Sequence, residues 1–576
     1  MEKRWILKEQ GDKKEVDALA EALNVKENIA NLLVQRGINS FDEARNFFRP
    51  QLEDLYDPFL MKDMTQAIDR IGTAINRHER ILIYGDYDVD GTTAVALVYS
   101  FFSEHYDNMG FYIPDRYSEG YGISTQGIDF ASDNNFSLII ALDCGIKAIE
   151  KVKYANKKNI DFIICDHHTP GKQLPEAVAI LDPKRFDCEY PYKELSGCGV
   201  GFKLVQAFAR INGIPFDSLI PLLDLVAVSI ASDIVPIIDE NRVLAYYGLQ
   251  QLNSNPRPGL KIICQIAGLG EKEISISDVV FKIGPRINAA GRMETGSKAV
   301  ELLLAENDKQ SFGMGNTINV YNTDRRKIDQ EITSEALQTI CQDHKMLNSK
   351  STVIYNPDWH KGVIGIVASR LIETHYKPTV VLTESNGFAT GSARSVPGFN
   401  LYKAMESCSH LLVSFGGHMY AAGLTLKKEN VEAFSECFEK AVSEAITEEQ
   451  MVPAINIDLD LNLENITDSF VRILNQFQPF GPENMAPVFV TRNVKASTSS
   501  RLVGANGEHI KMEVLQNEDR KIAAIAFNQS HNSDVLQNEM KFDICYTIEE
   551  NVFRGEKTLQ LNVKDIKKSE ALQDEG

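Results

Sequence analysis

Four clusters of aspartate and histidine constrain this chain more than any other feature of its sequence. They lie in the segments YGDYDVDG (84–91), IIALDCGI (139–146), FIICDHHTP (162–170) and VSIASDIVPI (228–237). Three of them directly follow short apolar runs typical of buried strands, at 81–84, 138–142 and 162–165. Helix-like stretches separate these runs, which predicts an α/β fold with a doubly wound parallel sheet.

In such a sheet, ligands bind beyond the carboxyl ends of the strands. Carboxylates that follow three successive strands should therefore converge, and their mutual repulsion requires a positive partner, most simply divalent metal ions. The clusters offer oxygen and imidazole donors, which suit Mn²⁺ or Mg²⁺ better than a sulfur-bound metal. Two ions about 3.5–4 Å apart, bridged by one carboxylate, would activate water and hold a phosphoryl group. Asp143 is the candidate for the bridge because it is central in the sequence order.

The alternative for any single aspartate is a helix N-cap or a turn residue. Asp90-Gly91-Thr92 does resemble the start of a helix. Four clusters that are all caps by coincidence are a weaker explanation than one metal site.

Composition excludes several other classes of protein. The chain has 576 residues and a formal net charge of −20, which argues against coating nucleic acid by bulk electrostatics but leaves room for a nuclease with a local basic channel. Its nine cysteines include no CxxC pair, so neither a disulfide framework nor a zinc ribbon is predicted. The first residues, MEKRWILKEQGDKK, lack the apolar core of a signal peptide, and we expect a cytoplasmic protein.

One apolar segment, Leu219–Ile238, is long enough to resemble a membrane span. It contains Asp224 and Asp233, each costing roughly 2.5–3.5 kcal/mol near a bilayer centre, and it is interrupted by Pro221 and Pro236. We expect a buried core helix that delivers one acidic residue to the site.

The pattern of hydrophobic residues divides the chain into several domains. Apolar residues recur on one face between Ile328 and Ile340, which predicts a long connecting helix. Strict alternation from Ile455 to Leu463 predicts a half-buried strand, and the short strand-like runs that follow favour a small barrel of the oligonucleotide-binding (OB) type. The predicted parts are an N-terminal helical segment (1–64), the α/β metal domain (65–300), the connecting helix (301–345), a second α/β domain (346–450), the OB-like domain (451–567) and a disordered tail (568–576).

The ordered motifs resemble the DHH phosphoesterase superfamily, and most closely its RecJ family of bacterial exonucleases specific for single-stranded DNA. The resemblance extends over nearly the whole chain, in IPDRYSEGYG (113–122), GCGVGFKL (197–204), KIGPRINAAGRM (282–293), WHKGVIGIVASRL (359–371), GSARS (391–395), SFGGHMYAAG (414–423) and FQPFGPENMAPVF (477–489). The last block departs from the PFGxGNPxPVF that is usual in the family.

The resemblance assigns roles to the acidic clusters. It implies metal binding by Asp88, Asp90, Asp143, His167 and Asp233, with Asp86 either a further ligand or a hydrogen-bond partner of one. Tyr84 stands where smaller members of the superfamily have a histidine ligand. His168 would face the scissile phosphate, in a catalytic group with Asp143 and Asp166. The alternative for His168 is a packing role beside a ligand.

The second α/β domain resembles the DHHA1 module, which grips nucleic acid. Glycines allow close approach of backbone N–H groups to a phosphate, and arginines add charge-assisted hydrogen bonds. The implied nucleic-acid contacts are Arg116, Arg286, Arg292, Ser392, Arg394, Ser395, Gly416, Gly417 and His418. The alternative is a simple glycine turn with arginines in surface ion pairs.

From the resemblance we expect a metal-dependent exonuclease that degrades single-stranded DNA from 5′ to 3′ into mononucleotides, in DNA recombination and repair. The family also implies a single-strand-binding protein and a RecQ-type helicase as partners. One alternative is a superfamily enzyme for short oligonucleotides, cyclic dinucleotides or pyrophosphate. The other is a non-catalytic replication scaffold, which degenerate metal motifs would mark.

Overall fold

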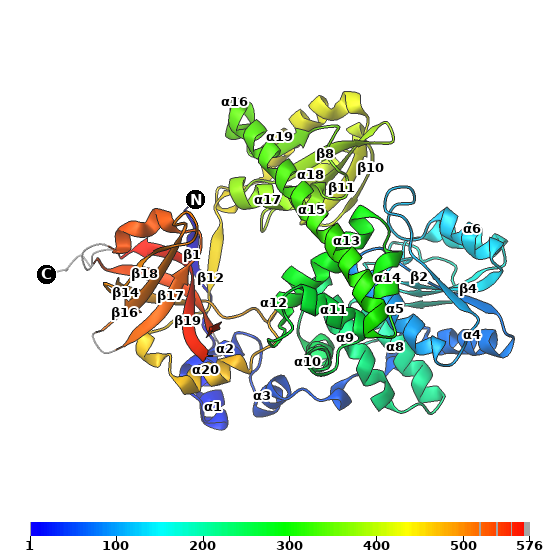
Figure 1. Cartoon of the computed structure of the whole chain (residues 1–576), viewed down its shortest axis with the longest axis horizontal. Helices are drawn as coiled ribbons and strands as arrows, with labels where there is room; N and C mark the ends of the chain where they lie inside the picture. Colours follow the sequence, from blue (N-terminus) through cyan, green and yellow to red (C-terminus); the bar gives the residue numbers. More distant parts are fainter. Residues whose placement is uncertain (1, 518–519, 537–539, 554–555, 570–576) are drawn as a thin grey trace. The chain divides into compact units, whose positions relative to one another are not determined.

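The computed structural model describes residues 2–517, 520–536, 540–553 and 556–569, and nothing is described of the side chains of 552–556. It contains two compact units, one of Leu52–Val452 and one that combines Met1–Gln51 with Pro453–Gly576 (Figure 1). The sequence prediction of one N-terminal segment (1–64) differs from this division, which falls at residue 51. Residues 570–576 of the predicted tail lie outside the described part of the chain.

The larger unit begins with the predicted parallel sheet. Its strand order is β3-β2-β4-β5-β6, and all four pairings are parallel. The three apolar runs of the sequence form its centre, as predicted. The strands are β2 (Arg80–Gly85), β3 (Met109–Tyr112), β4 (Phe136–Leu142), β5 (Asp161–Cys165) and β6 (Ala179–Leu181).

Both faces of this sheet are covered, which explains why its strands are apolar throughout. Ile81 and Ile83 of β2 belong to one core, whereas Leu82 and Tyr84 belong to the core on the opposite face. The helices of this region are α4 (Met64–Asn76), α5 (Val89–Ser103), α6 (Thr125–Asp133), α7 (Ile149–Lys157), α8 (Gly197–Ile211), α9 (Leu223–Asp233), α10 (Asp239–Ser254), α11 (Pro258–Ile266), α12 (Ile276–Asp278), the π-helix η4 (Val279–Ile283), α13 (Gly284–Met293) and α14 (Ser297–Leu303). Helix α9 is the buried helix expected within 219–238, and it ends at Asp233.

A single helix, α15 (Asp308–Gln342), leads into the second α/β domain and is followed by the short α16 (His344–Asn348). Ile332 and Ile340 of α15 pack against the core of α17 (Ile364–His375), as the apolar face of the sequence predicts. Asp329 of the same helix forms a 2.8 Å ion pair with Arg370 of α17.

The second α/β domain has a five-stranded sheet of order β10-β11-β9-β8-β7, in which only β7 and β8 pair in parallel among the described pairings. Its strands are β7 (Thr352–Tyr355), β8 (Thr379–Ser385), β9 (Phe388–Arg394), β10 (Leu412–Gly417) and β11 (Ala421–Leu426). Helices α18 (Leu401–Ser407) and α19 (Val431–Ala445) complete it.

The smaller unit joins the two ends of the chain. Strand β1 (Arg4–Leu7) pairs in parallel with β12 (Ala454–Ile457), and apolar side chains of the N-terminal helices share one core with the C-terminal strands. The remaining elements are α1 (Lys13–Leu23), α2 (Glu27–Val34), α3 (Phe41–Phe48), β13 (Leu459–Asp460), α20 (Asp468–Asn475), β14 (Phe489–Ala496), β15 (Arg501–Val503), β16 (His509–Leu515), β17 (Lys521–Ala526), β18 (Phe542–Phe553) and β19 (Glu556–Lys568). Pairings run β14-β18-β19-β17-β16, and β16 also pairs with β14, so they form a closed circuit.

The single strand predicted from Ile455 to Leu463 is wrong. The segment divides into β12 and β13, which pair with β1 and β14 respectively. Asp458 stands at the break and accepts hydrogen bonds from the Lys8 ammonium and the Val488 amide, each at 2.8 Å. Alternation alone could not reveal a break at which the chain changes partners.

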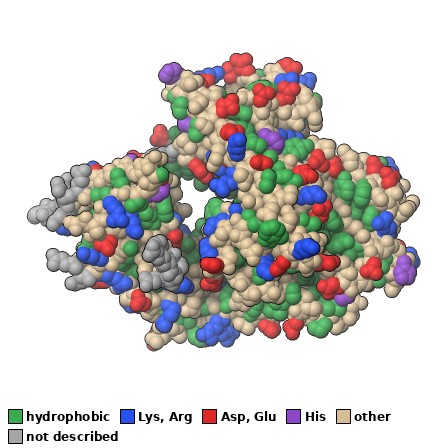
Figure 2. Space-filling model, viewed as in Figure 1, with side chains coloured by type: hydrophobic (Ala, Val, Ile, Leu, Met, Phe, Trp, Pro, Cys, Tyr) green, Lys and Arg blue, Asp and Glu red, His purple; other side chains and the backbone are tan. Residues whose placement is uncertain are grey.

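The charges on the surface and the hydropathy of the helices are consistent with the amino-acid composition. Acidic and basic side chains are interspersed on the face in Figure 2. Among the described helices, none combines the length and the apolar character that crossing a bilayer requires.

Candidate metal centre and nucleic-acid interface

The carboxyl edge of the parallel sheet brings the predicted acidic residues together. Asp86, Asp143 and Asp166 each follow the last residue of a strand, β2, β4 and β5. These strands are neighbours in the sheet, so the three carboxylates lie side by side. Asp143 adopts the left-handed backbone conformation, with φ of 58°.

Asp88 and Asp90 enter the site from the start of α5. Asp88 is the N-cap and accepts a 3.0 Å hydrogen bond from the Gly91 amide, so the cap interpretation holds for this residue alongside its place in the cluster. Asp90 is buried in the first turn and accepts 2.7 Å hydrogen bonds from the Gly197 and Cys198 amides at the start of α8. A helix N-terminus favours an anion, so the amides at the start of α8 suit a carboxylate at this position.

His167 lies at the centre of the cluster. Its Nε2 atom is 3.2 Å from Asp143 Oδ1, 3.6 Å from Asp233 Oδ2 and 3.7 Å from Asp90 Oδ2. Two overlapping groups have ligand atoms close enough to share a cation, namely Asp143 with His167 and His168, and Asp90 with His167 and Asp233.

The cluster lacks positive charge to match its carboxylates. Asp86 Oδ2 and Asp143 Oδ1 are buried and accept no hydrogen bond from any described residue. Burial, followed by repulsion from Asp88 or Asp90, raises the pKa of both carboxyls well above the ordinary range. Burial lowers the pKa of His167, so this imidazole does not supply the missing charge. Buried oxygens without donors, beside a neutral imidazole, fit hard divalent cations such as Mn²⁺ or Mg²⁺.

Asp166 differs from its neighbours because its oxygens are fully used. It accepts hydrogen bonds from the amides of Ile146, His167 and His168, and a 2.7 Å bond from the His168 Nδ1. Burial alone would raise its pKa, but the hydrogen bond and charge of His168 lower it overall. In turn Asp166 outweighs the burial of His168 and raises the pKa of that imidazole to about 9. His168 Nε2 is 3.1 Å from the Tyr121 hydroxyl.

Tyr84 takes part in shaping the site. Its hydroxyl donates a 2.9 Å hydrogen bond to the carbonyl of Gly122, and the Gly122 amide donates to Asp86 Oδ1 at 3.2 Å. The tyrosine therefore fastens the loop 113–124 beside the acidic cluster.

A group of cationic side chains lies near one another in the larger unit. The Arg116 guanidinium stacks on Tyr87, 4.0 Å from the ring centroid. Arg292 donates a 2.8 Å hydrogen bond to the carbonyl of Gly362 in the second α/β domain. Burial and then the charges of Arg116, Arg325 and Arg394 lower the pKa of Arg292 to about 9. Mutually repelling cations of this kind favour binding of an anion such as a phosphate.

The other side chains predicted to contact nucleic acid have hydrogen-bond partners within the protein. Arg394 donates to Ser392 Oγ at 2.9 Å, which orients the guanidinium, whereas the Ser395 hydroxyl is occupied by the Phe399 carbonyl at 2.8 Å. Arg286 lies on α13 and contacts Asn319 of α15 at 3.3 Å.

The glycine motif forms the end of an edge strand. Gly416 and Gly417 end β10, and His418 follows with its amide bonded to the Ala421 carbonyl. Gly417 has a φ of 149°, and a Cβ there would lie 2.3 Å from the Ala421 oxygen. A Cβ at Gly416 would clear every described residue, so this backbone is open to approach.

Sequence reasoning missed two residues of the centre. A Cβ on Gly197 would lie 2.7 Å from Asp143 Oδ1, so only glycine lets α8 approach the carboxylate so closely. Tyr121 contacts His168 across 47 positions of sequence. Both lie in blocks that had been noted for their resemblance, but no local pattern marks either contact.

A parallel sheet with this aspartate and DHH-histidine centre defines a phosphoesterase of the DHH class. Family models agree, matching "DHH family, N-terminal domain" at residues 80–230, "DHHA1 domain" at 348–444 and "RecJ OB domain" at 457–565.

The chain belongs to the RecJ family. It is 37% identical over 569 residues to the single-stranded-DNA-specific exonuclease RecJ of Bacillus subtilis, covering 98% of this chain and 71% of that protein. It is 31% identical to the same-named protein of Escherichia coli, covering 93% of this chain and 95% of that protein.

Solved structures share the fold. The Mn²⁺ complex of RecJ from Thermus thermophilus has a TM-score of 0.84 at 24% identity, covering 99% of this chain and 80% of that chain. A structure of exonuclease RecJ bound to manganese has a TM-score of 0.59 at 28% identity, covering 69% and 97% respectively.

Proposed function

We propose that this protein is a metal-dependent exonuclease that hydrolyses single-stranded DNA from the 5′ end into mononucleotides, in DNA recombination and repair. One observation carries the proposal: the carboxylates of Asp90, Asp143 and Asp233 converge on His167 Nε2, and the Asp143 Oδ1 atom among them is buried and accepts no hydrogen bond from the described residues. The preference for single-stranded DNA is inferred from the names of the relatives, and the 5′ polarity from the family resemblance.

The metal ligands in this proposal are Asp88, Asp90, Asp143, His167 and Asp233, with Asp86 at their edge. Asp143 is the proposed shared ligand because Oδ1 accepts no hydrogen bond within the described residues and faces His167. Bound Mn²⁺ or Mg²⁺ ions, two in number, would lower the pKa of water and stabilise charge on a phosphoryl group.

Asp166 orients the His168 imidazole and favours its protonated form. Asp166 holds the His168 imidazole by its Nδ1–H and keeps it charged, which leaves Nε2 to face an incoming phosphate beside Tyr121. A cation placed there stabilises the negative charge that develops during hydrolysis. His168 is therefore the proposed catalytic residue, and Asp166 positions it.

We propose that single-stranded DNA is contacted by two regions, one in each unit. In the larger unit, Arg116, Arg292 and Arg394 would neutralise phosphates, aided by the open backbone at Gly416. The Ser395 hydroxyl is tied to Phe399, so Ser392 is the better candidate of the two serines. In the OB-like domain, Phe527 is 53% exposed and is a candidate stacking platform; the side chain of Phe553, the other candidate, lies outside the described residues.

Action in the cytoplasm remains a proposal. Two further proposals rest on the resemblance alone, namely partnership with a single-strand-binding protein and partnership with a RecQ-type helicase. The domain division proposed from sequence is retained for residues 65–450, with residues 1–51 assigned to the unit that contains the OB-like domain.

The test is digestion of 5′-labelled and 3′-labelled single strands, with duplex DNA and RNA of the same sequence, in Mn²⁺ and in Mg²⁺. We expect immediate release of a labelled mononucleotide from the 5′-labelled strand and progressive shortening of the 3′-labelled one. Release from the 3′ end first would contradict the polarity. Turnover limited to very short oligonucleotides or cyclic dinucleotides would favour a small-substrate enzyme, and no turnover in a folded, metal-loaded protein would favour a scaffold.

A further inference from the structure

Two cysteines of the second α/β domain are in direct contact. Cys408 follows the last residue of α18, and Cys437 lies in the middle of α19. Their sulfur atoms are 2.8 Å apart, although the residues are 29 positions apart in sequence. All nine cysteines lie in the described part of the chain, and no other sulfur–sulfur contact is found there.

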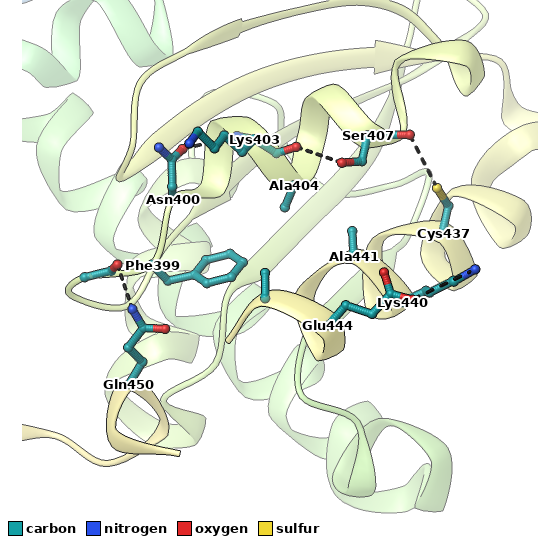
Figure 3. A pocket seen from close by; sticks show the side chains of 12 residues that line it. Phe399, Asn400, Lys403, Ala404, Ser407, Cys437, Lys440, Ala441, Glu444 and Gln450 are labelled. Atoms are coloured by element: carbon teal, nitrogen blue, oxygen red, sulfur yellow. Dashed lines mark hydrogen bonds and ion pairs between the residues drawn. The ribbon is translucent and has the colours of Figure 1, made fainter. Parts of the chain in front are cut away.

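The two thiols differ in access. Cys408 is fully buried in the domain core, and burial raises the pKa of its thiol. Cys437 is half-buried and lines a cavity of about 580 Å³ between α18 and α19. Figure 3 shows its sulfur beside the Ser407 carbonyl, at the end of the cavity wall.

The cavity suits a small polar reagent. Its volume falls within the range of about 300–1,000 Å³ that small-molecule sites occupy. Lys403 of α18 and Lys440 of α19 line it, together with Asn400 and Gln450 (Figure 3). Glu444 also lines the cavity, 4.0 Å from the Lys440 ammonium, so the lining presents charges of both signs. A small disulfide that carries both ammonium and carboxylate groups, such as oxidised glutathione, is compatible with this lining.

We propose that Cys408 and Cys437 form a redox-reactive dithiol site, which a low-molecular-weight disulfide oxidises to an intramolecular disulfide. The sulfurs, 2.8 Å apart, need to approach by less than an ångström to reach the bond length of about 2.05 Å.

The reaction proceeds in two balanced exchanges. The Cys437 thiolate attacks one sulfur of the reagent, and its S–S bond breaks to give a mixed disulfide and one small thiolate. Cys408 then attacks the Cys437 sulfur, which forms the protein disulfide and releases the second small thiolate. The protons lost by the two cysteines are taken up by the two released thiolates, so the protein is oxidised by two electrons and the reagent is reduced to two thiols.

The product would join the end of α18 to α19. From Cys408 the chain continues through the short helix η5 (Ser409–Leu411) into β10, which ends in Gly416-Gly417. The disulfide site thus lies on the same segment as the glycine motif, outside the metal centre, and its existence does not depend on the proposed nuclease activity.

The experiment equilibrates the folded full-length chain with mixtures of oxidised and reduced glutathione, blocks free thiols and digests with trypsin. Cleavage after lysine places the two cysteines on separate peptides, 404–427 and 429–440, each with one cysteine. We expect a disulfide-linked pair of these peptides, loss of two titratable thiols, and full reversal by dithiothreitol.

Two serine variants make the test specific. Cys437→Ser should abolish the linked pair and leave Cys408 reduced, because the buried thiol has lost its accessible partner. Cys341→Ser, which removes an exposed cysteine of α15, should leave the linked pair unchanged. The proposal is overturned if Cys437 remains a stable mixed disulfide with glutathione, if no linked pair forms, or if it forms only after the protein is unfolded.

Discussion

Asp143 occupies a position that suits a carboxylate only when a cation shares it. It is buried, adopts a positive φ, and presents an oxygen that accepts no hydrogen bond from the described residues. Without metal, its charge costs stability because the carboxylate is buried and because Asp90 and Asp88 repel it. With metal, the same charge becomes a ligand. Stability measurements can therefore distinguish a metal ligand from a simple cap.

We predict that Asp143→Asn reverses the effect of metal on thermal stability. In chelator the variant should melt several degrees above wild type, because a repelling buried charge has been removed. In excess Mn²⁺ the order should invert, because the variant loses stabilisation by bound ions. Nucleotide release should fall below about a tenth of wild type, because the proposed shared metal ligand is lost. A tenfold loss corresponds to about 1.4 kcal/mol of activation free energy. Identical melting curves in both conditions would remove Asp143 from the metal centre.

If the Arg394 guanidinium contacts a DNA phosphate, its charge should contribute to the salt dependence of single-stranded-DNA binding. Arg394→Ala should weaken single-strand binding by about 1.5–3 kcal/mol, with a shallower salt slope, if the guanidinium contacts a phosphate. Arg210→Ala is the control, because Arg210 is exposed and pairs with Asp57 at the surface. Fluorescence anisotropy across a salt series measures both quantities. Unchanged affinity and slope in Arg394→Ala would reduce this residue to packing.

At the scale of elements, the start of α8 is the part of the site that depends most on close packing. Its amides hold Asp90, and its first residue, Gly197, lies against Asp143. The helix can approach this far only because position 197 lacks a side chain.

We predict that Gly197→Ala disables the centre while Gly199→Ala does not. A Cβ at 197 would lie 2.6 Å from the Asp143 Cβ, whereas at 199 its nearest neighbour is Ser196 Oγ at 3.3 Å. Displacing a catalytic group by about 1 Å can cost on the order of 10²-fold in rate. Single-turnover nucleotide release, with circular dichroism as a folding check, measures the difference. Equal rates for the two variants would show that the site tolerates movement of Asp143.

The sequence was sufficient for the sheet and its acidic edge because each strand is a continuous apolar run followed by a carboxylate. The connecting helix was visible for a similar reason, in the spacing of Ile328, Ile332, Leu337 and Ile340. Contacts between distant positions could not be predicted from the sequence, because no local pattern links Gly197 to Asp143 or Tyr121 to His168. The same limit hid the break at Asp458, where hydrogen bonds from Lys8 and Val488 come from remote segments.

At the scale of the whole molecule, the proposed metal centre lies in the larger unit, and the OB-like domain, one of the two regions proposed to bind single-stranded DNA, lies in the smaller unit. Every proposed metal ligand lies between Leu52 and Val452. A chain cut only near residue 450 would keep the N-terminal helices while removing the strands that cover their apolar residues, such as Val16 and Leu19. Both ends must therefore be removed together.

We predict that a chain of residues 52–452 retains metal-dependent hydrolysis of short oligonucleotides. It should lose affinity and processivity on strands much longer than the roughly 4–16 nucleotides that one OB fold occupies. Comparing rates on short and long strands for the full and shortened chains tests this. Proportional losses on both lengths would mean that the smaller unit supports the catalytic unit instead of holding DNA.

The most direct test is the rate of nucleotide release from a 5′-labelled single strand as a function of free Mn²⁺, for wild type and His167→Gln. His167 Nε2 faces Asp90, Asp143 and Asp233, so its loss should damage the metal centre alone. We expect no release by wild type in chelator, saturating release with added Mn²⁺, and either no release by the variant or a half-saturating Mn²⁺ concentration raised at least tenfold. Release that persists in chelator, or an unchanged Mn²⁺ dependence in His167→Gln, would contradict the account.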